Sequence, residues 1–234
     1  VIRNSEVLND KNLKNFICCF NGANQISRQF LVSLLYKFKL FDNFYCSKNF
    51  LFDVNSLDGN IVLYTREQEN FYRKFFIEEN NLEANEFYKT PIGFHYKPYD
   101  HLHNINVISD RILDSFVQVV TETIGTSYYP FVSEKFVYPI LCKTLWVGYA
   151  QPGYHDYLEK YYGFKKYSKV FNYNFDQIRN PVIRAVELIS MLLKFEKLSR
   201  LDWHDLYQIE QDVIEYNYYW YRSGKYLEKI KQYD

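Results

Sequence analysis

The sequence predicts an α/β protein, in which a doubly wound parallel sheet carries helices on both faces. Short apolar runs typical of buried strands alternate along the chain with segments whose apolar residues recur at helical spacing. The 234 residues are 47% hydrophobic and 24% charged, which is the composition of a folded globular chain. Neither an internal repeat nor a low-complexity linker interrupts the chain.

The first 110 residues predict two strands and one helix. Residues 15–20 (NFICCF) form an apolar run that ends at turn residues, so we expect a buried strand there. A helix follows, because apolar side chains recur at helical spacing over residues 30–38. Residues 60–65 (NIVLYT) predict a second strand. Residues 66–110 show poor periodicity, and we interpret them as an irregular insertion with some helix near residues 67–76.

The next segment carries the clearest strand signals. Residues 116–123 (FVQVVTET) are rich in β-branched side chains, and residues 145–150 (LWVGYA) form another apolar run. Between them we expect a helix that starts at Ser133, whose hydroxyl can cap the first turn. A kink is expected at Pro139, which lacks an amide donor. A further helix is predicted over residues 154–162.

The remainder of the chain is predicted to be mostly helical. Gly163 would end the preceding helix in a left-handed conformation. Residues 166–171 predict one more short strand. Apolar residues then recur at helical spacing over residues 182–193 and again over residues 206–220.

Composition and charge bear on partners and compartment. Lys and Arg together number 28, as do Asp and Glu, so the formal net charge is zero, which disfavours a binder of the nucleic-acid backbone. No apolar run approaches the roughly 18 residues of a membrane span, so no membrane contact is expected. The cysteines lie in apolar runs without metal-ligand spacing, which predicts reduced, buried thiols and a cytoplasmic location. They are Cys18, Cys19, Cys46 and Cys142.

Loops follow three of the predicted strands, and in a parallel sheet such loops meet at the carboxyl ends of the strands. Their residue types suit a phosphate group. Arg28 offers a fork of donors, Lys135 a mobile cation, and the helix start at Ser133 free amides and the positive end of a dipole. Glu122 and Glu134 could accept from sugar hydroxyls. The plainer alternative is an ordinary helix cap beside a solvated lysine.

A longer pattern unites these features. A strand ends in Glu122, a Ser-Glu-Lys triplet opens a helix at residues 133–135, a strand with a glycine-containing turn follows, and a helix closes on Gly163 and Phe164. This pattern resembles the donor-binding half of GT-B glycosyltransferases, in the group that includes the α-1,3-fucosyltransferases and related phage and giant-virus enzymes. The resemblance extends over roughly residues 15–222.

The resemblance implies a Rossmann-like domain of residues 1–180 that binds a nucleotide-diphosphate sugar. Residues 181–234 would form a helical segment that packs on this domain or on a further amino-terminal domain. It also implies inverting sugar transfer to a glycan, a protein or a modified DNA base, in the host cytoplasm if the protein is viral. No cofactor other than the donor is implied, and no metal, because the chain has no D-x-D triplet.

Roles for individual residues come from the same resemblance. By analogy, Arg28 and Lys135 would hold the diphosphate, Glu134 the ribose, and Glu122 the sugar or its neighbourhood. Glu122 is also the candidate catalytic residue. The full set of candidate donor-binding residues is Asn24, Arg28, Glu122, Thr123, Ser133, Glu134, Lys135 and Gly148.

A second function remains open from the residues alone. A GT-B enzyme has two such domains, so a single one could be a non-catalytic nucleotide-binding or assembly module. The aromatic run at residues 216–221 (YNYYWY) cannot face one core, so we expect an exposed contact surface over residues 205–222, for a second copy or an amino-terminal domain. We interpret His101 and His103 as solvated loop residues, and His155 as a surface residue.

Overall fold

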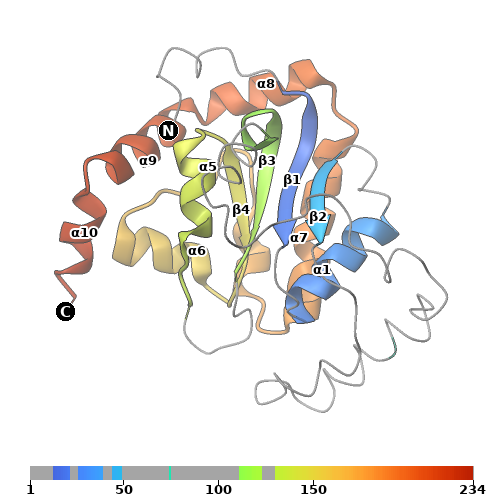
Figure 1. The fold of residues 1–234 in the computed structure, drawn as a ribbon, viewed down its shortest axis with the longest axis horizontal. Coiled ribbons are helices and arrows are strands. Elements are labelled where there is room, and N and C mark those ends of the chain that lie inside the picture. Colours follow the sequence, from blue (N-terminus) through green and yellow to red (C-terminus); the bar gives the residue numbers. More distant parts are fainter. Residues whose placement is uncertain are drawn as a thin grey trace, which may run out of the picture.

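The computed structural model describes residues 13–21, 26–38, 44–48, 74, 111–122 and 130–233. Its four described strands form one parallel sheet in the order β2-β1-β3-β4 (Figure 1). The strands are β1 (Asn15–Asn21), β2 (Phe44–Lys48), β3 (Ser115–Thr121) and β4 (Leu145–Tyr149). The predicted α/β class with a parallel sheet is confirmed.

Helices lie on both faces of this sheet (Figure 1). The helices are α1 (Ile26–Lys37), α5 (Val137–Leu141), α6 (Tyr154–Tyr157), α7 (Pro181–Glu196), α8 (Arg200–Ile209), α9 (Gln211–Arg222) and α10 (Lys225–Ile230). The shorter helical turns are η5 (Glu134–Phe136), η6 (Leu158–Tyr162) and η7 (Tyr173–Gln177). Figure 1 shows α5 and α6 on the near face of the sheet and α7 behind it.

Two side chains of β4 show how the faces are covered. Trp146 and Tyr149 point to opposite faces, because successive strand residues alternate. The Trp146 ring lies 5.6 Å from the ring of His155 in α6, whereas the Tyr149 hydroxyl donates to the carbonyl of Pro181, the first residue of α7. Helix α1 packs against α7 and therefore belongs to the second face.

Strand β3 lies between β1 and β4, and all seven of its residues are buried. Val117, for example, sits opposite Ile17 on one side and Leu145 on the other. A strand that is covered on both faces and paired on both edges has no solvated side, which explains its run of β-branched and aromatic residues.

The carboxyl-terminal helices pack on the same sheet. The ring of Trp203 in α8 stacks on Phe16 and Phe116, with ring centroids 5.4 and 6.0 Å apart. Phe16 and Phe116 are each the second residue of their strand, so α8 covers the amino ends of β1 and β3, as Figure 1 also shows. Helices thus cover both faces of the sheet and the amino ends of β1 and β3.

Several element predictions are confirmed. Strands form at residues 15–21, 115–121 and 145–149, and a helix spans the predicted segment after β1. Ser133 has extended backbone angles, and its side chain accepts a hydrogen bond from the amide of Lys135, as expected of a cap. Gly163 follows η6 with a φ of 83°, in the left-handed region that favours glycine.

The strand predicted over residues 166–171 is wrong. The amides of Lys169 and Val170 donate to the carboxylate of Glu210, at 2.6 and 3.1 Å, and the amide of Tyr167 donates to the hydroxyl of Tyr173. Because side chains take these backbone donors, the segment forms a turn at residues 168–170 instead of joining the sheet.

Three helix predictions need correction. The helix after Ser133 is a three-residue 3-10 turn followed by only five α-helical residues, so its dipole is small. The helix over 154–162 turns into a π-helical segment at Leu158. The periodic pattern over 206–220 belongs to two helices that meet at Glu210, so Ile209 is 48% exposed.

Strand β2 was missed by the sequence analysis, because its five residues (FYCSK) are too few to show periodicity. The predicted strand at 60–65 and the insertion at 66–110, with its helix near 67–76, lie outside the described residues apart from Lys74. His101 and His103 also lie outside them.

The aromatic residues of α9 are packed more fully than expected. The rings of Tyr216 and Trp220 stack 5.7 Å apart, and the Trp220 indole donates to the carbonyl of Tyr162. Tyr221 stacks on Tyr226 of α10. Tyr219, 63% exposed, is the large exposed side chain of this run. The expected contact surface over residues 205–222 stays a prediction.

Candidate anion-binding site

Glu122 directly follows β3 and is the centre of the candidate site. Its backbone amide donates to the carbonyl of Tyr149, which extends the ladder between β3 and β4 by one residue. The residue is only 1% exposed, and three donors of the chain reach its carboxylate. Oε1 accepts from the Tyr154 hydroxyl at 2.7 Å and from the Ser133 amide at 3.1 Å, and Oε2 accepts from the Ser133 hydroxyl at 2.5 Å. These bonds offset the cost of burying a carboxylate.

Lys135 lies next to this carboxylate, with part of its side chain open to solvent. Its Nζ donates to the Ser133 hydroxyl at 3.1 Å and lies 3.9 Å from Oε2 of Glu122. The side chain keeps 27% of its surface exposed. Burial lowers the pKa of Lys135, and the nearby positive charge of Arg28 lowers it further. Two cations are therefore held close enough to repel each other.

Arg28 reaches the site from the first turns of α1. The residue is 3% exposed, and its Nη2 donates to the carbonyl of Thr121 at 3.2 Å. Thr121 in turn donates through its hydroxyl to the side-chain oxygen of Asn21, which ties the carboxyl ends of β1 and β3 together. Burial lowers the pKa of Arg28, while the charge of Glu122 opposes that shift.

The structure thus places Arg28, Glu122, Ser133 and Lys135 together at the carboxyl ends of β1 and β3, as their positions after predicted strands suggested. Glu134 is exposed on the same turn and attracts both cations electrostatically. The formal charges of Arg28 and Lys135 are thus balanced by those of Glu122 and Glu134, and the buried Glu122 is the carboxylate that already holds three donors of the chain.

One expectation about this site is wrong. The helix start at Ser133 was expected to direct free amides at a phosphate, but the Ser133 amide and hydroxyl already donate to Glu122. The Lys135 amide is likewise capped by the Ser133 hydroxyl at 3.4 Å. The carboxylate of Glu122 therefore takes the position at this turn that a bound anion would otherwise occupy.

His155 is not at the surface, contrary to expectation. It is 3% exposed, and its Nε2 accepts from the Gly148 amide at 2.9 Å. The imidazole proton therefore resides on Nδ1, which lies 2.9 Å from Oδ1 of Asp176 but without the alignment of a hydrogen bond. Asp176 also accepts from the His155 amide through Oδ2, at 3.0 Å.

Gly148 supports the site rather than lining it. A Cβ at this position would come within 2.8 Å of the Tyr154 ring, so only glycine lets the two pack this closely. Tyr154 itself is fully buried, and its pKa is raised well above the ordinary value, first by burial and then by Glu122. Sequence reasoning missed Tyr154 and Asp176, since neither belongs to a recognisable motif. Asn24 and Thr123 lie outside the described residues.

Other kinds of site find little support in the described part of the chain. Within it, no group of three or more His, Cys, Asp or Glu side chains is placed to hold a metal ion. None of the helices in those same ranges combines the length and apolar character that a membrane crossing needs.

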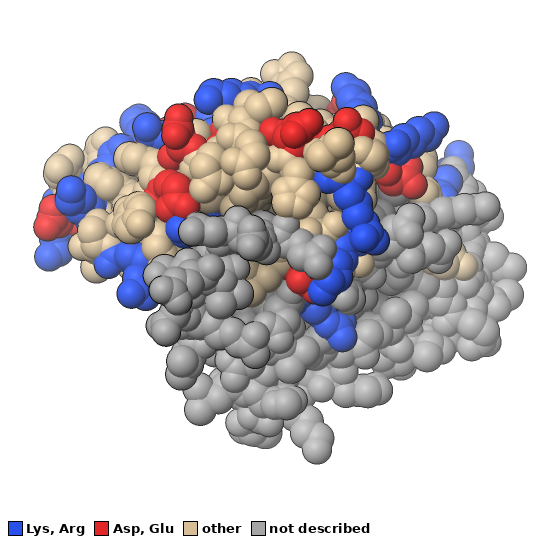
Figure 2. Space-filling model, turned by 90° about the horizontal axis from the view of Figure 1, so that it is seen from above, with Lys and Arg blue, Asp and Glu red and all other residues tan. Residues whose placement is uncertain are grey.

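Cys18, Cys19 and Cys142 are buried free thiols, as predicted. Figure 2, seen from the α8 end, shows acidic and basic side chains interspersed over the described atoms.

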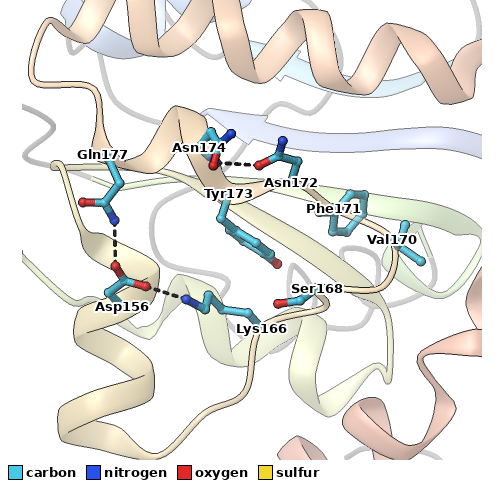
Figure 3. A pocket seen from close by; sticks show the side chains of 9 residues that line it. All are labelled: Asp156, Lys166, Ser168, Val170, Phe171, Asn172, Tyr173, Asn174 and Gln177. Carbon is cyan, nitrogen blue, oxygen red and sulfur yellow. Dashed lines mark hydrogen bonds and ion pairs between the residues drawn. The ribbon is translucent and has the colours of Figure 1, made fainter.

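An open hollow of about 590 Å³ lies between α6 and the segment that leads into η7 (Figure 3). Its charged groups are paired with each other. The Asp156 carboxylate accepts from Lys166 at 2.5 Å and from Gln177 at 2.7 Å. Tyr173 stands in the middle of the hollow, and its ring lies 4.6 Å from the ring of His155. None of the residues predicted to bind a donor lines this hollow.

No protein-family model matches the chain, and comparison with curated proteins and with solved structures likewise found no match. A function for the chain is therefore argued from its own residues and their geometry.

Proposed function

We propose that the cluster at the carboxyl ends of β1 and β3 binds the diphosphate of a nucleotide sugar, and that the chain is the Rossmann-like, donor-binding half of a glycosyltransferase. The observation that carries this proposal is the pairing of Arg28 with Lys135. Two cations from separate elements converge beside a buried carboxylate, and the charge of Arg28 lowers the pKa of Lys135. A diphosphate would relieve this repulsion and accept hydrogen bonds from both side chains.

The fold supports the same proposal. Ligands of open parallel sheets bind outside the carboxyl ends of the strands, which is where Arg28 and Lys135 lie. The Ser-Glu-Lys triplet at 133–135, which resembles the donor-binding turn of GT-B enzymes, forms the edge of the cluster. Among the described residues, helices cover the two faces and the amino end of the sheet (Figure 1).

In the proposed reaction an acceptor hydroxyl attacks the anomeric carbon of the sugar while the bond to the diphosphate breaks, and the hydroxyl proton passes to a carboxylate base, which by the resemblance to GT-B enzymes would lie on an amino-terminal domain. Negative charge builds up on the departing diphosphate, and Arg28 and Lys135 stabilise it. Glu122 has a positioning role in this proposal and is not the catalytic base, because all three of its donors come from the chain itself. The acceptor would be a glycan, a protein or a modified DNA base.

A second function, a non-catalytic nucleotide-binding module, is favoured by one observation. Among the described residues Glu122 is the carboxylate that pairs with Lys135, and its hydrogen bonds to Tyr154 and Ser133 leave it poorly placed to take a proton from an acceptor. Such a module would bind the same nucleotides without turning them over.

Thermal-shift measurements with GDP, UDP and their sugars test the proposal, with guanosine and uridine as phosphate-free controls. We expect the diphosphates and their sugars to raise the melting temperature and the nucleosides to leave it unchanged. No stabilisation by any diphosphate would overturn the site. A donor-hydrolysis assay then separates the two functions, since turnover supports the transferase and binding without turnover supports the module.

A further inference from the structure

Tyr154 joins the candidate site to the buried pair of His155 in α6 and Asp176 in η7. Its hydroxyl donates to Oε1 of Glu122 at 2.7 Å, and its ring packs on Gly148. The next residue, His155, is held between the Gly148 amide and the carboxylate of Asp176. The backbone carbonyl of Asp176 also accepts from the Gly153 amide at 2.7 Å. These contacts hold the start of α6 against the end of β4 and against η7, on both sides of Tyr154.

The Tyr154 hydroxyl affects the charge balance around Lys135. Glu122 shares its negative charge among three donors and holds it 3.9 Å from the Lys135 ammonium group. A carboxylate that loses a donor in a buried environment attracts its remaining partners more strongly. Without the phenol, Glu122 would draw Lys135 closer and neutralise more of its charge.

We infer that Tyr154 is a positioning residue, which keeps Glu122 at its present distance from Lys135 and so limits how much of the ammonium charge this carboxylate neutralises. The buried pair of His155 and Asp176 anchors Tyr154 in this role. The consequence for ligand binding rests on the proposed function, whereas the effect on Lys135 itself does not.

The test compares Tyr154→Phe with Tyr149→Phe. Both tyrosines are fully buried, and each hydroxyl donates one hydrogen bond, to Glu122 from Tyr154 and to the Pro181 carbonyl from Tyr149. Both variants therefore lose a buried hydroxyl and its hydrogen bond, to a carboxylate at the site in Tyr154→Phe and to a backbone carbonyl away from it in Tyr149→Phe. Melting temperatures show whether they lose stability to a similar degree.

The first readout is the pKa of Lys135, followed by NMR of side-chain-labelled lysine and assigned with Lys135→Arg. We expect a higher pKa for Lys135 in Tyr154→Phe than in the wild-type chain, and an unchanged pKa in Tyr149→Phe. An unchanged pKa in both variants would overturn the inference, even if the protein binds no nucleotide.

The second readout is affinity for a nucleoside diphosphate and for the matching nucleoside, measured by calorimetry with GDP and guanosine or with UDP and uridine. We expect Tyr154→Phe to weaken diphosphate binding about fivefold, which is less than the loss of a hydrogen bond to a charged group because Lys135 is retained, and to leave nucleoside binding unchanged. An equal loss for both ligands, or the same loss in Tyr149→Phe, would mean that Tyr154 acts only through stability. A wild-type chain that binds no diphosphate contradicts the proposed function, while the lysine titration still decides the role of Tyr154.

Discussion

Both carboxylate oxygens of Glu215 lie 2.7 Å from the ammonium group of Lys143. The pair joins α9 to the turn that precedes β4. In this turn Lys143 has a φ of 47°, in the left-handed region. Its side chain is 8% exposed, and the ring of Tyr218 lies 4.6 Å from its Nζ. The contact therefore ties the tail helices to the sheet at the end opposite the candidate site.

Removing this carboxylate should destabilise the fold. We expect Glu215→Ala to lower the free energy of unfolding by about 1.5–3 kcal/mol, because it leaves a buried ammonium group without its charged partner. Chemical denaturation measures the change. The exposed carboxylate of Glu228 in α10 provides the control, and a loss in Glu228→Ala as large as that in Glu215→Ala would contradict the assignment.

Gly163 and Gly224 form a pair of sites that separates backbone strain from a steric clash. Both have positive φ, 83° and 72°, but a Cβ on Gly163 would lie 2.8 Å from the Trp220 ring, whereas one on Gly224 meets nothing within 4 Å. We expect Gly224→Ala to cost about 1–2 kcal/mol, the strain of an L-residue in the left-handed region. Gly163→Ala should cost clearly more in the same denaturation experiment. Equal losses would show that Trp220 moves aside freely.

Glu210 gives a prediction about pH. Burial raises the pKa of its carboxyl, although the amides of Lys169 and Val170 donate to it and act in the opposite direction. The folded chain therefore binds this proton more tightly than the unfolded chain, so stability falls as the pH rises from 4.5, the ordinary value, through the raised pKa.

Glu210→Gln keeps an oxygen for the two amides and removes the charge. We expect the variant to be more stable than the wild-type chain at neutral pH, with the difference shrinking as the pH falls through the raised pKa toward 4.5, the ordinary value. Unfolding free energies measured across this range give the comparison. A difference that does not change with pH would contradict the assigned shift.

Lys135→Ala tests the diphosphate contact directly. We expect it to weaken binding of a nucleoside diphosphate by about 1.5–3 kcal/mol, the range for a hydrogen bond to a charged group, and to leave nucleoside binding unchanged. Isothermal titration with both ligands makes the measurement, with Lys231→Ala in the exposed carboxyl-terminal turn as the control. Equal losses for the two ligands would place Lys135 away from the phosphates.

The general layout of the fold and the location of the cluster followed from the sequence because they depend on patterns. Apolar runs marked β1, β3 and β4, and the rule that loops meet at the carboxyl ends of parallel strands brought Arg28 together with Lys135. These inferences need only periodicity and the order of elements along the chain. They do not need the position of any single atom.

The details of the site could not be predicted in this way. The contact between Glu122 and Tyr154 joins residues 32 positions apart and depends on how closely α6 approaches β4 at Gly148. The pairing of His155 with Asp176 likewise depends on the turn at η7. The Ser133 amide was expected to face a phosphate but donates to Glu122 instead. A sequence shows which donors are present, but it does not show which acceptor each donor binds in the fold.

The pairing of β1 with β3 has a consequence for how the chain is made. The hydroxyl of Thr121 binds the side chain of Asn21, a hundred residues earlier, and the central strand that buries β1 is synthesised only after that interval. At about 5–20 residues per second, a ribosome needs roughly 5–20 seconds to produce it. During that time β1 and α1 expose apolar surface without their permanent neighbour. We therefore expect nascent chains truncated before residue 115 to depend on chaperones, and chains that extend past β4 to be released from them.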